Sequence, residues 1–109
     1  MAITYKVLGQ SNPSATTATT IYTAPSLTQA VISTITVCNQ SATNATYRIA
    51  VVPNGDTLSA ENYVVYDESV IANSTTALTL GITLGAGDFI QVYTSSASIS
   101  FNAFGSEVN

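Results

Sequence analysis

Apolar residues alternate with small hydroxylated residues over much of this chain. The alternation is clearest from Ala30 to Cys38, and the stretch from Ala97 to Phe104 repeats it. A period of two places one face of a β-strand in a core and the other face in water or against a partner. The polar residue of the pattern is almost always Ser, Thr or Asn and seldom charged. Such a surface suits packing against other chains better than acid–base chemistry, so the pattern predicts an all-β structural module.

Clusters of Gly, Pro, Asn and Ser divide the chain into eight short segments with this pattern. The expected strands are Ile3–Leu8, Thr16–Thr23, Gln29–Asn39, Ala45–Val52, Asn62–Asp67, Thr75–Leu80, Phe89–Thr94 and Ser98–Phe104. No segment has the period of a helix, apart from room for one helical turn within Thr57–Glu61. Short strands at regular intervals predict an antiparallel β-sandwich, jelly-roll-like, of about eight strands. We expect a single β-sandwich domain over residues 1–109.

The pattern also predicts pairing and burial. Gln29–Asn39 is the longest expected strand and should be central, and Phe89–Thr94 should form a hairpin with Ser98–Phe104. A shift of register by one residue would exchange the buried and exposed faces of a strand. The expected core positions include Val31, Ile35, Val37, Ile49, Val51, Ile90, Val92 and Phe101.

Composition narrows the choice of partner. The 109 residues are 46% hydrophobic and only 7% charged, with a net charge of −4. Two basic residues, Lys6 and Arg48, cannot neutralise a run of phosphates, so no nucleic-acid partner is expected. The same shortage argues against docking on an anionic membrane, and no apolar run approaches the ~20 residues of a membrane span. No signal peptide is visible at the start of the chain, so we expect synthesis in the cytoplasm of a host cell.

The sequence offers no catalytic, cofactor-binding or metal-binding set. Without His, zinc–histidine sites and Ser-His-Asp triads are excluded, and a single Lys leaves the hydroxyls without an obvious base. The lone Cys38 cannot form an internal disulfide and is expected to be a buried, structural thiol. Asp56 and Asp88 lie beside Gly in turns, where a carboxylate typically caps backbone amides.

Two weaker alternatives stay open. The acids Asp56, Asp67, Glu68 and Asp88 could hold Ca²⁺, although their spacing matches no known calcium loop. A platform of tyrosines could bind carbohydrate, although the chain has no Trp. The preferred interpretation is that the tyrosines contact another protein or lie at the margin of the core. The six tyrosines are Tyr5, Tyr22, Tyr47, Tyr63, Tyr66 and Tyr93.

Three segments carry a family resemblance. These are the opening Met1–Gln10, the Ser/Thr/Ala-rich segment that ends in Ile21-Tyr22-Thr23, and the closing Ser100–Glu107. Together they resemble small virion structural proteins of tailed bacteriophages, in particular those of phages of aquatic bacteria, including cyanophages. The resemblance extends over essentially the whole chain and rests on the residue pattern of the expected strands and on the end segments. It implies a structural protein of the virion rather than an enzyme, and carries over no functional residues.

From the resemblance and the composition we expect a capsid decoration or cement protein on the capsid surface. Its expected partners are the major capsid protein or other virion proteins, and copies of itself in a homo-oligomer, with a trimer favoured. The alternatives are a tail, neck or fibre protein of the particle and, in another class, a carbohydrate-binding module. The terminal segments Ala2–Gly9 and Phe101–Asn109 are expected to reach a neighbouring chain, because central strands are already paired.

Overall fold

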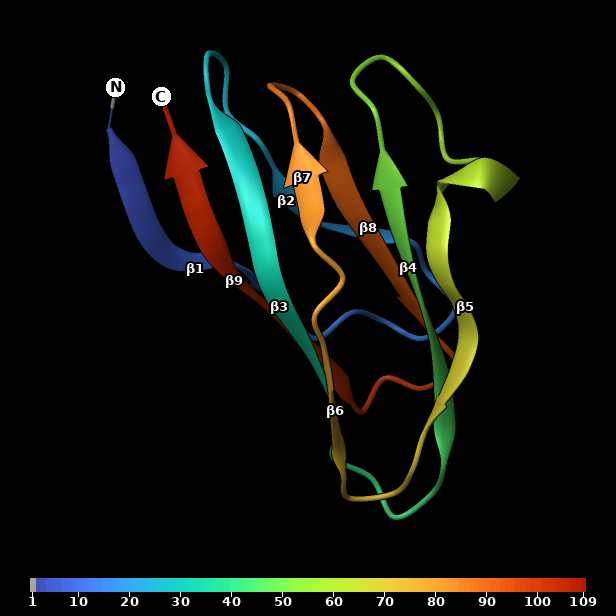
Figure 1. The fold of residues 1–109 in the computed structure, drawn as a ribbon. Helices are drawn as coiled ribbons and strands as arrows, with labels where there is room; N and C mark the ends of the chain where they lie inside the picture. The colour runs from blue at the N-terminus through green and yellow to red at the C-terminus, as the bar shows by residue number, and fades with distance from the viewer. Residues whose placement is uncertain (1) are drawn as a thin grey trace.

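The structure, a computed structural model, describes residues 2–109 as two antiparallel β-sheets packed together (Figure 1). Sheet A contains β1 (Ile3–Ser11), β3 (Gln29–Asn39), β6 (Thr75–Leu78), β7 (Ile82–Leu84) and β9 (Ile99–Val108). Sheet B contains β2 (Thr19–Thr23), β4 (Ala45–Val52), β5 (Tyr63–Val70) and β8 (Phe89–Thr94). One turn of 3-10 helix, η1 (Ala60–Asn62), precedes β5. Within residues 2–109 no helix has the length and apolar character to cross a membrane.

The strand order is that of a jelly roll. In sheet A the order is β1-β9-β3-β6, with β7 also paired to β3, and in sheet B it is β2-β8-β4-β5. Because β6 and β7 lie end to end along β3, they act as two parts of one interrupted strand. The chain crosses from one sheet to the other between most successive strands, which interlocks the two sheets. The predicted β-sandwich is therefore confirmed.

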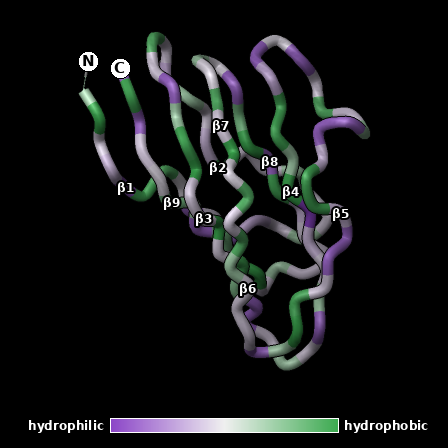
Figure 2. The backbone as a smooth tube through the Cα atoms, in the orientation of Figure 1, coloured by the Kyte–Doolittle hydropathy of each residue, from purple (hydrophilic) through white to green (hydrophobic). Residues whose placement is uncertain are grey.

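The inner faces of the two sheets form the core. Its largest members, Tyr47 of β4 and Phe101 of β9, come from opposite sheets and meet edge to face with ring centroids 6.2 Å apart. Figure 2 shows short alternations of hydropathy along the strands rather than long apolar runs. Each branched or aromatic side chain removed from water in this way stabilises the fold by roughly 1.5–3 kcal/mol.

One predicted core position, Val31, is wrong because of a bulge in β3. Six of the eight predicted core residues are buried and Val51 is partly buried against the core, but Val31 is 42% exposed. The pairing of β3 with β9 shifts between Ile32 and Thr34. An extra residue at this point exchanges the two faces of the strand, so Ala30 and Ile32 point inward before the bulge and Ile35 points inward after it. Val31 is therefore on the outer face.

The predicted hairpin of Phe89–Thr94 with Ser98–Phe104 is wrong. These segments are β8 and β9, which lie in different sheets and pair with different strands. The connection between them passes from one sheet to the other at an end of the sandwich instead of turning back within one sheet. Alternation alone cannot distinguish these outcomes, because both strands need one buried face in either case.

The terminal strands pair with each other. β1 runs antiparallel to β9 from Ile3 opposite Val108 to Ser11 opposite Phe101. Beyond them, Ala2 and Asn109 exchange two backbone hydrogen bonds of 2.8 and 3.0 Å. β9 also pairs with β3, so the expectation that both terminal segments are free to pair with a neighbouring chain is wrong for β9. Of the two terminal strands, only β1 lies at an edge of sheet A and keeps a free side; β6 and β7 form the other edge.

Candidate functional site

An arginine clamp lies on the outer face of sheet B. Arg48 of β4 binds Asp67 of β5 through two hydrogen bonds, Nε to Oδ1 at 2.7 Å and Nη2 to Oδ2 at 3.3 Å. Its guanidinium carbon lies 4.2 Å from the ring centroid of Tyr66 and 4.3 Å from that of Tyr93. Such contacts place a cation against the electron-rich face of an aromatic ring. One basic side chain thus joins three neighbouring strands.

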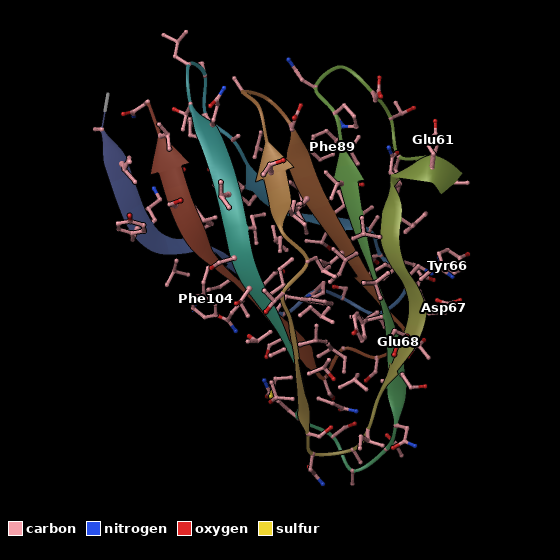
Figure 3. The ribbon with its side chains drawn as sticks, viewed as in Figure 1. Glu61, Tyr66, Asp67, Glu68, Phe89 and Phe104 are labelled. Carbon is pink, nitrogen blue, oxygen red and sulfur yellow. The ribbon has the colours of Figure 1, made fainter. Side chains whose placement is uncertain are left out.

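A bulge in β5 builds this arrangement. The register between β4 and β5 shifts between Tyr47 and Ile49, so an extra residue of β5 faces Arg48. Asp67 has a φ of 53°, the left-handed region that Asp adopts more readily than most residues. The bulge lets both Tyr66 and Asp67 reach Arg48, and Figure 3 shows these two side chains pointing away from the rest of the sandwich.

Arg48 and Asp67 each stabilise the charged form of the other. The hydrogen bonds from Arg48 lower the pKa of the Asp67 carboxyl below its usual value, so this carboxylate stays ionised over a wide range of pH. The same contact raises the pKa of Arg48. The guanidinium charge is therefore already neutralised by a partner of the same chain.

A shallow hollow of about 580 Å³ lies beside the clamp, lined by Leu58, Ser59, Ala60, Tyr63 and Tyr66. Tyr63 and Tyr66 meet nearly perpendicular, with ring centroids 4.9 Å apart and an interplanar angle of 85°. Together with Tyr93 and Arg48 they form what we define as the tyrosine face. The hollow is open to solvent and presents aromatic rings beside hydroxyl groups.

The wall of the hollow is η1, held by its own side chains. The Ser59 amide donates to Oδ1 of the buried Asn62 at 2.8 Å, and the Ser59 hydroxyl donates to Oε1 of Glu61 at 2.7 Å. The hydrogen bond from Ser59 lowers the pKa of the Glu61 carboxyl. The predicted helical turn within Thr57–Glu61 is thus present as η1, slightly later in the sequence.

A second surface of different character lies on the outer face of sheet A. We define the apolar face as Ile3, Tyr5, Val7, Val31 and Phe104, which are 37–82% exposed. The register places Tyr5 and Val31 on either side of Ser106, and Val7 beside Phe104. Four of the five residues line a hollow of about 590 Å³ that Ile3 does not reach. Figure 3 shows Phe104 on the opposite side of the molecule from Tyr66.

The apolar face continues to the end of the sandwich. Leu27, in the loop before β3, is 92% exposed and has a φ of 58°, a region that is unfavourable for a leucine. It lines a further hollow together with Val108 and Asn109. A large apolar side chain held out from the surface in a strained backbone is a feature associated with contact sites.

A polar network behind the apolar face fixes β1 in place. The Tyr22 hydroxyl of β2 donates to Oε2 of Glu107 at 2.5 Å, and Lys6 Nζ lies 2.9 Å from Oε1 of the same carboxylate. These two hydrogen bonds, from Tyr22 first and from Lys6 second, lower the pKa of Glu107. Burial, with Glu107 beside it, raises the pKa of Tyr22. The network links β1, β2 and β9 across the two sheets.

The tyrosines considered for a carbohydrate platform and the acids considered for a calcium site do not all lie together in the structure. Tyr22 and Tyr47 are buried and Tyr5 is on sheet A, so three of the six tyrosines gather on sheet B. Among residues 2–109 no three His, Cys, Asp or Glu side chains form a cluster suited to a metal ion. The acids proposed for Ca²⁺ are instead dispersed over the clamp, an edge strand and two turns.

Of the two turn aspartates, Asp88 has the predicted role. Its Oδ1 accepts from the Asn54 amide and its Oδ2 from the Gly85 amide, both at 2.8 Å, which joins two loops. For Asp56 the described part of the chain shows a backbone hydrogen bond to Pro53 but no side-chain hydrogen bond. Capping by Asp88 could be predicted because it follows Gly87 in a turn; its bond to the distant Asn54 could not.

The prediction that Cys38 is buried is wrong. The thiol is half-buried on the outer face of sheet A, where Cys38 is paired with Thr75 and Ser100. Its neighbours Val37 and Asn39 take the inward positions. Asn39 is a buried polar residue, and its side-chain amide satisfies the carbonyls of Thr43 and Val70.

Comparisons with known proteins bear on the fold. Neither protein-family models nor curated proteins give a match to this sequence. A chain in the solved structure of infectious bursal disease virus, Gx strain, is similar in fold, with a TM-score of 0.55 and 13% sequence identity. The similarity covers 97% of this chain and 32% of that chain, so this chain spans about a third of the length of its structural neighbour. The likeness establishes a shared fold.

Proposed function

We propose that this chain is a structural protein of a virus particle, acting on the capsid surface as a decoration or cement protein. The observation that carries the proposal is the apolar face, on which five large apolar side chains stand exposed on one side of a sheet. Such patches on an otherwise polar surface mark contacts with other proteins. The hydroxylated outer surface of the sheets suits the same use.

The fold supports a particle role. The structural neighbour is a chain of a virus structure, and the jelly roll is a fold that recurs in viral capsids. By analogy of fold, and with the sequence resemblance to virion proteins of tailed bacteriophages, we assign the chain to a phage particle. The proposed partners are the major capsid protein and two further copies of this chain in a trimer.

The proposed role is not enzymatic. A hydroxyl nucleophile needs a neighbouring base, and this chain has no His. Its two basic side chains, Lys6 and Arg48, are each held by a carboxylate. Function would then depend on buried area repeated over many copies rather than on a reacting group.

Localisation in purified particles tests the proposal. Quantitative mass spectrometry should find hundreds of copies per particle, and labelling or reconstruction should place them over contacts between capsid subunits. Density confined to the tail, neck or fibres would reject the capsid role and leave the structural class standing. Absence from purified particles would reject both.

Substitutions test whether the apolar face makes the contact. Replacing Tyr5 and Phe104 by Ser should greatly reduce incorporation into particles, while Ile71→Ser, at an exposed site (63%) between β5 and β6, should not. Because the contact is apolar, incorporation should tolerate raised salt. Equal loss with both substitutions, or release of the protein by moderate salt, would contradict this assignment of the interface.

A further inference from the structure

We propose that the tyrosine face of sheet B binds an uncharged carbohydrate chain, with the hollow beside Tyr63 and Tyr66 as the main subsite. This inference does not depend on the proposed role in the particle, since the apolar face and the tyrosine face lie on different sheets. The volume of the hollow, about 580 Å³, is within the range of about 300–1,000 Å³ for small-ligand sites.

The ring chemistry is the first argument. The C–H groups of a sugar ring carry partial positive charge and pack against the electron-rich face of an aromatic ring. Tyr66 is 59% exposed and Tyr63 stands beside it in the lining of the hollow. Two nearly perpendicular rings can contact two sides of one sugar, or successive sugars of a chain.

Preorganisation is the second argument. Tyr66 is held by Arg48, which is held in turn by the two oxygens of Asp67. The lining residue Ser59 is fixed by Glu61 and Asn62. Because these groups are already ordered, a ligand meets them without the loss of side-chain freedom that weakens binding. Arg48 and Asp67 here act as positioning residues for the ring.

Charge decides the class of ligand. The chain has two basic residues, and both are in ion pairs, Arg48 with Asp67 and Lys6 with Glu107 on the other sheet. An anionic glycan would find no unpaired Lys or Arg side chain among residues 2–109 and would meet a net charge of −4. A neutral sugar avoids both penalties.

Hydrogen-bond complementarity separates sugars from peptides. Proline-rich peptides also stack on tyrosines, but their backbone offers almost only acceptors. The hollow presents the hydroxyls of Ser59, Tyr63 and Tyr66, which donate and accept. Beside them lie two carboxylates, Glu61 bonded to Ser59 and Asp67 bonded to Arg48, which only accept when ionised. Sugar hydroxyls donate as well as accept, so they match this set. We therefore assign the site to a glycan rather than to a peptide.

Titration of the folded chain with neutral oligosaccharides tests the site. The probes are hexamers of β-1,4-glucose, β-1,3-glucose and N-acetylglucosamine and a mannan oligomer, with polygalacturonate and a proline decamer as comparison ligands. In nuclear magnetic resonance spectra, at least one neutral probe should shift the amide signals of residues 58–66 and 93. No shift with any neutral probe, shifts centred elsewhere, or preference for polygalacturonate or the proline peptide would overturn the proposal.

Variants locate the binding energy. Tyr66→Ala should weaken the affinity about tenfold, since it removes one stacked ring, and Tyr66→Phe should retain most of it. Tyr5→Ala removes a tyrosine of sheet A that is even more exposed, 82% against 59% for Tyr66, and should leave the affinity unchanged. Affinity that is insensitive to Tyr66→Ala, or equally sensitive to Tyr5→Ala, would overturn the assignment. Incorporation into particles should be unaffected by Tyr66→Ala, so a failure of this site is distinguishable from a failure of the proposed function.

Discussion

Tyr22 and Tyr47 are both buried tyrosines, but their hydroxyl groups meet opposite environments. The Tyr22 hydroxyl donates to the Glu107 carboxylate at 2.5 Å. The Tyr47 hydroxyl is buried in the core with no hydrogen-bond partner among the described residues. An unpaired buried hydroxyl destabilises a protein by about 1–3 kcal/mol. The hydroxyl of Tyr22 therefore stabilises the fold, whereas the hydroxyl of Tyr47 destabilises it.

This contrast predicts opposite effects of one substitution. Tyr47→Phe keeps the ring against Phe101 and removes the unpaired hydroxyl, so the free energy of unfolding should stay unchanged or rise by about 1 kcal/mol. Tyr22→Phe should lower it by about 1.5–3 kcal/mol, because the hydrogen bond is to a charged group. Urea unfolding of both variants and of the parent chain measures this. A loss of stability in Tyr47→Phe as large as in Tyr22→Phe would contradict the environment described for Tyr47.

The Glu107 carboxylate should make the free energy of unfolding depend on pH. Its pKa lies below the ordinary value of 4.5 in the folded chain, because Tyr22 and Lys6 stabilise the charged form. Its stabilising contribution is therefore fully present above pH 4.5 and is lost as the pH falls through the lowered, folded-state pKa. Comparison of the parent chain with Glu107→Gln by urea unfolding between pH 7 and about 2.5 should show their stability difference shrinking in acid. A difference that is constant over this range would refute the role of the charge.

At the scale of strands, bulges decide where side chains point. The bulge in β3 carries Val31 to the outer face, and the bulge in β5 carries Tyr66 and Asp67 to Arg48. Gly105 of β9 is paired with Ile32 beside the first bulge. A Cβ atom at Gly105 would lie 1.9 Å from the carbonyl oxygen of Val31. The absence of a side chain at Gly105 therefore permits β9 to approach β3.

This close approach predicts that Gly105→Ala is severely destabilising. The clash is with backbone, which cannot turn aside as a flexible side chain can, so a loss of about 3 kcal/mol or failure to fold is expected. Gly85→Ala is the matched control, since a Cβ atom there meets only Asp88 Oδ2 at 3.5 Å and the φ is not positive. Thermal unfolding followed by circular dichroism compares the two. Similar melting temperatures for both variants would contradict the packing at Gly105.

Alternation was sufficient to predict strands but not their irregularities. The bounds of β3, β4 and β8 agree with the predicted Gln29–Asn39, Ala45–Val52 and Phe89–Thr94. Short β7 was missed because Gly81–Leu84 has only three strand residues, and β1 and β9 run longer than predicted because they pair with each other. A bulge has no period of its own, so the exposure of Val31 could not be read from the sequence.

At the scale of the whole molecule, the two sheets present different outer faces. The candidate site could be anticipated only as residue types, because Arg48, Tyr66 and Tyr93 come from three strands brought together by long-range pairing. Loop crossings between the sheets, which set these pairings, leave no signal in local alternation. The sequence thus predicted a sandwich with tyrosines at its margin, and the strand order determines which tyrosines meet.

The meeting of the chain ends at one corner of the sandwich, visible in Figure 1, predicts that a circular permutant will fold. Ala2 and Asn109 are already joined by two hydrogen bonds, so a short glycine–serine linker between them should add little strain. New ends opened between Gly55 and Asp56 fall in an exposed turn. We expect the same circular dichroism spectrum and one cooperative thermal transition. A control opened between Ala103 and Phe104 interrupts β9, which is paired on both sides, and should not fold.

The permutant also separates two ways of binding in the particle. With Ala2 and Asn109 linked, the chain retains the side chains of the apolar face but no longer has free ends beside that face that could extend onto a neighbour. Incorporation equal to that of the parent chain would assign the contact to the side chains of that face, as proposed. If the folded permutant is excluded from particles, then the free ends at residues 2 and 109 make the contact instead, and the role of the apolar face is rejected. Unfolding of the loop-opened permutant would contradict the pairing of the ends itself.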